Sequence, residues 1–313
     1  MLGKTAGGLY WMARYLERSE NMARMIEAGQ RIALTRSYGE DEWESVLQSA
    51  GALDSYRQAH GREVMRDTAV DWLLRDLDNP SSIMSVISSA RSNAKLVRTA
   101  ITREVFESIN AAWITLSETL ARRVSERDLP AALSTVRQRA GLIRGAMHGT
   151  MLRNDIYNFA RIGTFIERAD NTARILDVKY YVLLPMASGV GTSLDNVQWQ
   201  SILQSVSGLG GYRMTYGQSI RPANIAQFLI RDRRMPRSLA FCCNKIRENL
   251  TYLEEDYGAA QPSSDLAAHL WGLVSDREIR AILDQGLHEF LQETMGTVAA
   301  LGSQIEKDYR FHV

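Results

Sequence analysis

The segments "YLERSENMARMIE" (residues 15–27) and "FIERADNTARILD" (residues 165–177) repeat one pattern 150 positions apart. Their apolar residues recur every three or four positions, which is typical of an amphipathic helix with one face in a protein core. The apolar positions differ between the segments, so that Met22 faces Thr172, whereas Glu, Asn and Arg recur at the same places. A core tolerates exchanges of similar volume. The recurring polar letters therefore indicate side chains that are held in a fixed geometry.

These polar side chains lie on one stripe of each predicted helix, opposite the apolar face. Arginine presents a rigid fork that pairs with carboxylate or phosphate in a geometry that lysine does not reproduce. Three interpretations stay open: a solvated face stabilised by pairs along the helix, a buried network where the two segments meet across a pseudo-twofold axis, and a ligand site. The candidate ligand-binding residues on the stripe are Glu17, Arg18, Asn21, Arg24, Glu167, Arg168, Asn171 and Arg174.

The repeat continues beyond these segments with an offset of 156 positions. The stretch "WESVLQSAGALDSYRQAHG" (43–61) aligns with "WQSILQSVSGLGGYRMTYG" (199–217), and "WLLRDLDNPSSI" (72–83) aligns with "FLIRDRRMPRSL" (228–239). So many matches at one spacing predict an internal duplication of a multi-helix unit.

The predicted duplication divides the chain into a first copy at residues 1–150 and a second copy at residues 151–313, packed into one globular unit. The change of offset places six extra residues in the second copy, around the Gly-rich stretch "PMASGVGTSLDN" (185–196), which we expect to form a connecting loop. Thr164 stands where the first copy has Arg14. One of two equivalent sites is therefore a candidate for loss of function.

Helical periodicity runs through the chain, which contains only six prolines and no convincing strand pattern. We predict an all-α helical bundle, built from the duplication in a pseudo-twofold arrangement. In "DNPSS", Pro80 is expected in the first turn of a helix, with Asn79 or Asp78 as its cap. The predicted helices are 6–34, 42–57, 62–77, 80–100, 103–124, 129–149, 153–184, 196–208, 222–233, 236–256, 264–274 and 276–308.

The composition excludes several classes of protein. With 37 basic and 36 acidic residues, the net charge of +1 gives no broad surface for nucleic acid or an anionic membrane. Charged residues interrupt any N-terminal apolar core, and no apolar run approaches the roughly 20 residues that span a bilayer. The two cysteines, Cys242 and Cys243, are adjacent and predict no disulfide framework. We expect a protein without a signal peptide or membrane span, in the reducing cytoplasm.

The sequence lacks the usual motifs of metal and nucleotide chemistry. None of the five histidines belongs to the Glu-x-x-His pattern of di-iron helical bundles. No Gly-x-Ser-x-Gly elbow is present, and no glycine-rich stretch after a strand ends in Gly-Lys-Ser/Thr. The cysteines stand in an apolar helix and are expected to pack as small hydrophobic residues. We therefore predict neither a metal site nor a bound cofactor.

A second group of repeated polar residues surrounds the Pro-x-Ser sequences at 80–82 and 236–238. Both sequences are expected to begin helices, whose N-terminal N–H groups attract anions. Simple helix capping is the structural alternative. If these residues converge with the stripe, they form a pocket for a carboxylate or phosphate, such as a peptide terminus or an acyl-phosphate. The additional candidate ligand-binding residues are Arg75, Asp76, Ser82, Arg231, Asp232 and Ser238.

The segments at 15–27 and 165–177 resemble the ER motifs of the bacterial alpha-E family, and the Arg-Asp…Pro-x-Ser sequences at 75–82 and 231–238 are similar to that family as well. The resemblance covers essentially the whole chain. It implies an all-α protein that is usually encoded beside a circularly permuted ATP-grasp ligase, with transglutaminase-like and proteasome-like peptidase genes often nearby. The implied setting is the synthesis or modification of a small peptide by ATP-driven amide formation. The resemblance assigns no catalytic residue.

Three functional hypotheses follow, and whether the chain is itself an enzyme is left open. The first is an accessory or binding protein for the ATP-grasp ligase, which presents an anionic peptide or intermediate. The second is a peptide-modifying enzyme, amide-forming or acyl-transferring, in which Glu17 and Glu167 act as acid or base and Arg24 and Arg174 stabilise an oxyanion. The third is a helical scaffold held together by the duplicated network.

Overall fold

The computed structural model describes residues 1–33, 41–183 and 193–312, and this part of the chain forms helices and no strands. The all-α prediction is therefore confirmed. Most of the predicted loop at 185–196 lies outside the described residues. The fifteen helices are α1 (Gly3–Ala33), α2 (Asp41–Ser49), α3 (Leu53–His60), α4 (Arg66–Leu74), α5 (Ile83–Leu96), α6 (Arg103–Thr119), α7 (Leu129–Thr150), α8 (Asp155–Leu183), α9 (Ser193–Ser205), α10 (Leu209–Tyr216), α11 (Pro222–Arg231), α12 (Leu239–Tyr257), α13 (Pro262–Ser275), α14 (Ile279–Gln285) and α15 (Leu287–Asp308).

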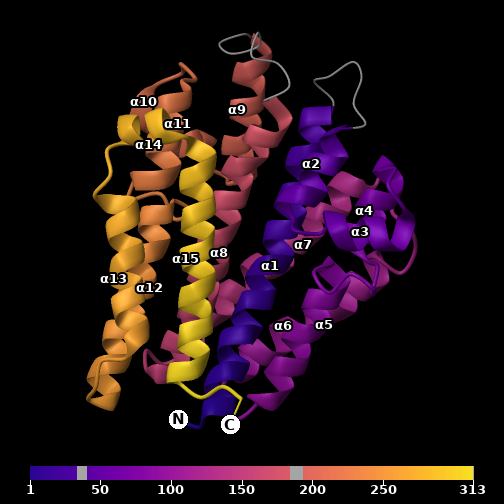
Figure 1. The fold of residues 1–313 in the computed structure, drawn as a ribbon. Coiled ribbons are helices and arrows are strands. Elements are labelled where there is room, and N and C mark those ends of the chain that lie inside the picture. The colour runs from indigo at the N-terminus through magenta and orange to yellow at the C-terminus, as the bar shows by residue number, and fades with distance from the viewer. Residues whose placement is uncertain (34–40, 184–192, 313) are drawn as a thin grey trace.

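Helices α1 and α8 carry the two ER segments and pack against each other in the middle of the molecule (Figure 1). Helix α1 also packs against α5 and α7, and α8 also packs against α12 and α15. Because neighbours cover these two helices on several sides, both the apolar side chains and many of the polar side chains of the ER segments are buried. The repeated segments therefore form the centre of the fold rather than part of its surface.

The remaining helices flank this central pair on two sides. In Figure 1, α5 and α6 lie on one side of the pair and α12 and α13 on the other, while the two termini lie together at one end. Close to that end, the rings of Tyr10 and Phe311 are 5.3 Å apart. The pseudo-twofold arrangement and the duplication into residues 1–150 and 151–313 stay predictions from the sequence.

Two of the predicted helices are each interrupted by a glycine in a left-handed backbone conformation. The predicted helix 42–57 is in fact α2 and α3, because Gly51 between them has a φ of 67°. The predicted helix 276–308 is likewise wrong as one element, because Gly286 separates α14 from α15 with a φ of 117°. Helix α10 was not predicted, since two glycines in its first turn weaken the helical pattern.

The Pro-x-Ser sequences begin helices through their serines. The Oγ atoms of Ser82 and Ser238 each accept a hydrogen bond from the backbone N–H three residues ahead, at 3.2 and 3.0 Å. The prediction that Pro80 lies in the first turn, capped by Asn79 or Asp78, is wrong, because α5 begins directly after Ser82. The structural alternative of helix capping therefore accounts for both serines.

Within the ranges that the structure describes, none of the helices combines the length and the apolar character that crossing a membrane requires. The two longest helices, α1 and α8, carry the charged ER segments near their middle.

Gly163 allows the close approach of α1 and α8. A Cβ atom at this position would lie 2.3 Å from the carbonyl oxygen of Tyr10 on α1. Real Cβ atoms do not come so near to a backbone oxygen, so any larger residue would push the two helices apart. Glu167 lies one helical turn beyond Gly163 and is thereby brought within reach of α1.

We predict that Gly163→Ala destabilises the protein by about 1–3 kcal/mol, because the added methyl group overpacks the contact between α1 and α8. Gly145→Ala is the matched control. Gly145 lies exposed on α7, and a Cβ atom added there would have no other atom within 4 Å, so its replacement is expected to stabilise the helix by about 0.5–1 kcal/mol. Urea unfolding of both variants measures the difference, and equal midpoints would contradict this role of Gly163.

Candidate functional site

The two ER motifs pair with each other across the contact between α1 and α8. Arg18 donates from Nε and Nη2 to the two carboxylate oxygens of Glu167, at 2.6 and 2.9 Å. Arg168 donates in the same way to Glu17, with both distances 2.8 Å. Glu17 and Glu167 are only 3% and 5% exposed. The interpretation of the stripe as a solvated face is therefore wrong for these residues, and a buried network joins the two segments.

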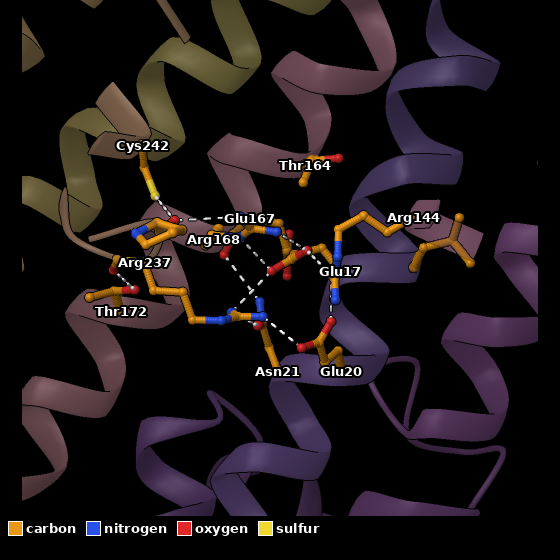
Figure 2. A network of polar contacts seen from close by, with 12 residues as sticks. Glu17, Glu20, Asn21, Arg144, Thr164, Glu167, Arg168, Thr172, Arg237 and Cys242 are labelled. Carbon is orange, nitrogen blue, oxygen red and sulfur yellow. Dashed lines mark hydrogen bonds and ion pairs between the residues drawn. The ribbon is translucent and has the colours of Figure 1, made fainter. Parts of the chain in front are cut away.

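Further arginines surround each buried carboxylate, and Figure 2 shows those around Glu17. Glu17 accepts a hydrogen bond from Arg237 at 3.1 Å and lies 3.5 Å from a guanidinium nitrogen of Arg144. Glu167 accepts a third hydrogen bond, from Arg14, also at 3.1 Å. Glu17 therefore faces guanidiniums from several elements of the fold, whereas both arginines that bond Glu167 come from α1.

The arginines keep the buried carboxylates ionised. Burial alone would raise the pKa of Glu17, but the guanidiniums of Arg168 and Arg237 outweigh it and hold this pKa below its ordinary value. The pKa of Glu167 is lowered against the effect of burial by Arg18 and Arg14. A carboxylate of this kind does not exchange protons near neutral pH, where a general acid or base works best.

Two turns further along, Arg24 and Arg174 hold the ends of other helices. Arg24 donates to Glu20, four residues before it, at 2.6 Å, and to the carbonyl oxygen of Ser205 at 3.0 Å. Arg174 donates to Asp170 at 2.6 Å and to the carbonyl oxygen of Ser49 at 3.3 Å. These serines end α9 and α2, where the helix dipole favours a cation.

Arg237 is a central residue that the sequence-based prediction did not include. Its Nη1 donates to Glu17 and to the Oδ1 atom of Asn21, both at 3.1 Å, and its Nη2 donates to Glu20 at 2.7 Å. The side chain is buried, and burial lowers the pKa of Arg237 to about 10. The sequence offers a clue, because Arg237 is the middle residue of a repeated Pro-x-Ser sequence and faces Ser81 in the other copy.

Glu20, Arg14 and Arg144 were missed as well. Glu20 is recognisable in retrospect, because each ER segment has an acidic residue four positions before its second arginine, Glu20 before Arg24 and Asp170 before Arg174. Arg144 comes from α7 and donates to Glu20 at 2.7 Å. It lies outside the repeated segments, so no pattern in the sequence marks it.

The candidates Arg75, Asp76, Arg231 and Asp232 do not join this network. Arg75 donates to the carbonyl oxygen of Leu120 at 3.0 Å, just beyond α6, and Arg231 donates to the last carbonyl of α13 at 2.8 Å. Asp76 and Asp232 each accept a hydrogen bond from the backbone N–H two residues ahead, at 3.0 and 2.8 Å. Together with the capping roles of Ser82 and Ser238, these contacts hold turns and helix ends.

A pocket of about 220 Å³ opens beside Glu167, between α1 and α8. Asn171 is 4% exposed, and its Nδ2 donor has no hydrogen-bond partner. In the part of the chain that the structure describes, Nη1 of Arg18 and Nη2 of Arg174 also have no acceptor. The lining residues are Arg18, Asn21, Met22, Met25, Ala50, Gly51, Ser81, Glu167, Asp170, Asn171 and Arg174.

A smaller cavity of about 30 Å³ lies beside Glu17 and is also lined by Arg144, Arg161 and His148. It has room for about two water molecules at most. Burial lowers the pKa of His148 to about 4, so the ring is neutral near pH 7. The Glu17 side of the network is therefore filled, and the Glu167 side is open.

The two cysteines are buried on α12. Burial raises the pKa of the Cys242 thiol to about 12 and raises that of Cys243 as well. A protonated, enclosed thiol is a poor nucleophile. Among the described residues, no group of three or more His, Cys, Asp or Glu side chains has the arrangement of a metal site.

Comparison with known proteins gives a family and two uncharacterised relatives. Residues 1–309 match a family described as a predicted alpha-helical domain with a conserved ER motif. Uncharacterized protein Mb2597 of Mycobacterium bovis and uncharacterized protein MT2643 of Mycobacterium tuberculosis are each 24% identical over 284 residues, covering 81% of this chain. The chain spans only 30% of the length of these relatives. No solved structure matches.

We predict that Glu17→Gln destabilises the protein by about 3–5 kcal/mol, because it leaves Arg168 as a buried guanidinium without a carboxylate and takes one of its two carboxylates from Arg237. Glu107→Gln is the control, since Glu107 pairs with Arg103 on the surface and is 57% exposed; this variant is expected to unfold like the wild type. Urea unfolding at pH 7 measures both. A Glu17→Gln variant as stable as Glu107→Gln would show that the network does not hold the helices together.

The lowered pKa values of Glu17, Glu20 and Glu167 also predict acid sensitivity. A carboxyl whose pKa is lower in the folded state stabilises the protein above its ordinary pKa of about 4.3, and this contribution is lost as the pH falls below that value. The free energy of unfolding should therefore fall on acidification from pH 6 to pH 3. The free energy of unfolding of Glu167→Gln, which has lost one such group, should fall less steeply over this pH range. Parallel profiles for this variant and the wild type would contradict the lowered pKa of Glu167.

Proposed function

Because this chain belongs to the Alpha-E family, we propose that it is the accessory binding component of an ATP-grasp-associated peptide ligation or modification system, and that it holds an anionic group of a peptide or reaction intermediate. The pocket beside Glu167 carries this proposal. Three nitrogen atoms have no acceptor among the described residues: Nη1 of Arg18, Nδ2 of Asn171 and Nη2 of Arg174. All three residues line the pocket, and Asn171 is almost fully buried. A carboxylate or phosphate oxygen would satisfy these donors.

Binding explains the site better than catalysis does. The enzyme hypothesis needs Glu17 or Glu167 to exchange protons, and the surrounding arginines lower the pKa of both. The scaffold hypothesis explains the ion pairs, but it leaves the buried Nδ2 of Asn171 without a partner. Buried donors in native proteins are nearly always satisfied, so this donor favours a ligand.

The relatives support a role beside another protein. In the two mycobacterial proteins the region similar to this chain makes up only 30% of the length, so it is joined there to much additional polypeptide. An ATP-grasp ligase is the partner that the family resemblance implies. It would supply the ATP chemistry for which this chain's sequence contains no phosphate-binding loop.

We predict that the purified protein does not hydrolyse ATP and that it co-elutes with the ATP-grasp ligase encoded beside it. In a reconstituted reaction followed by mass spectrometry, the product should appear only when both proteins are present. Separate elution at micromolar concentration, together with an unchanged yield without this chain, would contradict the proposal.

Arg174→Gln provides the matched test of the pocket. It removes a guanidinium from the lining, and we expect product formation to fall about tenfold or more while the protein stays folded. Arg103→Gln changes an exposed arginine that does not line the pocket and serves as the control. Equal yields from the two variants would show that the pocket does not bind the reactant.

A further inference from the structure

The two halves of the network are related residue by residue, with one difference at the centre. On α1, the residues Glu17, Glu20 and Asn21 together hold the guanidinium of Arg237. Their counterparts on α8, at the offset of 150, are Glu167, Asp170 and Asn171. All three counterparts line the pocket of about 220 Å³.

The counterpart of Arg237 is Ser81, and this serine also lines the pocket. The α8 side of the network therefore has the acidic and amide residues that surround a guanidinium on the α1 side, but its own chain supplies a short side chain there. The pocket therefore lies beside the position, Ser81, that aligns with Arg237 of the other half.

The charges of the two halves also correspond. Apart from Arg237, Glu17 and Glu20 are ion-paired with Arg168, Arg144 and Arg24. Glu167 and Asp170 are likewise ion-paired with three arginines, which are Arg18, Arg14 and Arg174. Since the α1 half holds a further guanidinium with this balance of charge, the α8 half is equally suited to one.

Unpartnered acceptors are present where a guanidinium would need them. On the α1 side, Oδ1 of Asn21 accepts a hydrogen bond from Arg237. On the α8 side, the Oδ1 atoms of Asn171 and of Asp170 have no donor among the described residues, and Arg174 bonds only Oδ2 of Asp170.

We propose that this pocket binds the guanidinium of an arginine residue in a peptide, which takes the place beside Glu167 that Arg237 takes beside Glu17. The inference rests on the proposed function, because the free donors of Arg18 and Arg174 would hold the anionic group of the same peptide. A volume of about 220 Å³ is smaller than the pockets of about 300–1,000 Å³ that enclose drug-sized ligands. It suits one side chain rather than a nucleotide.

The geometry favours arginine over lysine. Arg237 uses two nitrogens of one planar group to reach two carboxylates and an amide oxygen. An ammonium group is a compact point charge and does not reproduce this fork. The peptide is therefore expected to carry arginine at the position that enters the pocket.

Isothermal titration with N-acetylarginine, N-acetyllysine and N-acetylglycine tests the proposal on the full chain. We expect N-acetylarginine to bind one per chain and about tenfold tighter than either of the others. Ser81→Arg places a tethered guanidinium in the pocket, as Arg237 does in the other half, and should abolish this preference without lowering the melting temperature. Arg103→Gln, which changes an exposed arginine away from the pocket, should bind as the wild type does.

Arg237→Ser is the converse variant, because it opens the α1 half. Methylguanidinium at matched ionic strength should raise the melting temperature of Arg237→Ser more than that of the wild type, and should not raise that of Ser81→Arg. The shift is measured for each protein relative to its own melting temperature without methylguanidinium. The test therefore works even if Arg237→Ser is much less stable than the wild type. Equal shifts for the three proteins would overturn the inference.

The outcomes separate this inference from the proposed function. If N-acetylglycine binds and N-acetylarginine binds no tighter, the guanidinium site is wrong and the anion site stands. If methylguanidinium binds through the pocket and N-acetylglycine does not bind, the anion site is wrong and the guanidinium site stands. Absence of binding by every probe would overturn both.

Discussion

The structure depends on the exchange of guanidinium and carboxylate between α1 and α8. Each helix gives an arginine to the other's glutamate, and both pairs are two-pronged. A buried ion pair adds little stability compared with apolar packing, but removing one partner is costly. The exchange therefore fixes how the helices meet. Glu17 must face Arg168 and Arg18 must face Glu167, and a shift of one residue along either helix would break both pairs.

This requirement explains why the polar letters repeat better than the apolar ones. Around the exchange, other side chains extend the same constraint to further elements. Arg24 and Arg174 reach the ends of α9 and α2, and Arg168 and Thr172 bond carbonyl oxygens of the turn before α12. Apolar neighbours only have to fill space, so Leu16 and Ile166 can occupy equivalent positions, whereas the charged residues have no such freedom.

The sequence was sufficient for the fold class, because helical periodicity is a property of the chain itself. The repeated polar residues indicated a fixed geometry, but they left open whether the ER motifs face water, pair with each other or bind a ligand. The sequence was insufficient where contacts join distant segments. Arg237 and Arg144 enter the network from the turn before α12 and from α7. Arg237 lies in a repeated Pro-x-Ser sequence, but that repeat does not indicate its partners, and no spacing along the chain marks Arg144. Arg75 and Arg231 repeat as well as Arg18 and Arg168 do, yet they hold helix ends. Repetition therefore shows that a residue has a fixed partner, and only the structure shows which partner it has.

The open pocket arises from two positions rather than one. Ser81 faces it where the other half has Arg237. Gly51 faces it where the other half has Ser207, whose Oγ accepts a hydrogen bond from Arg24 at 2.8 Å. Gly51 and Ser207 both have a left-handed backbone, with φ values of 67° and 54°. Glycine adopts this conformation readily, whereas serine is strained in it. The α1 half thus fills its space with two side chains, one of them at a cost, and the α8 half leaves out both. Gly51 and Ser81 lie in separate segments, and both have small side chains where they line the same pocket. Since the buried Nδ2 of Asn171 beside them also has no partner, a ligand explains this space better than a packing defect does.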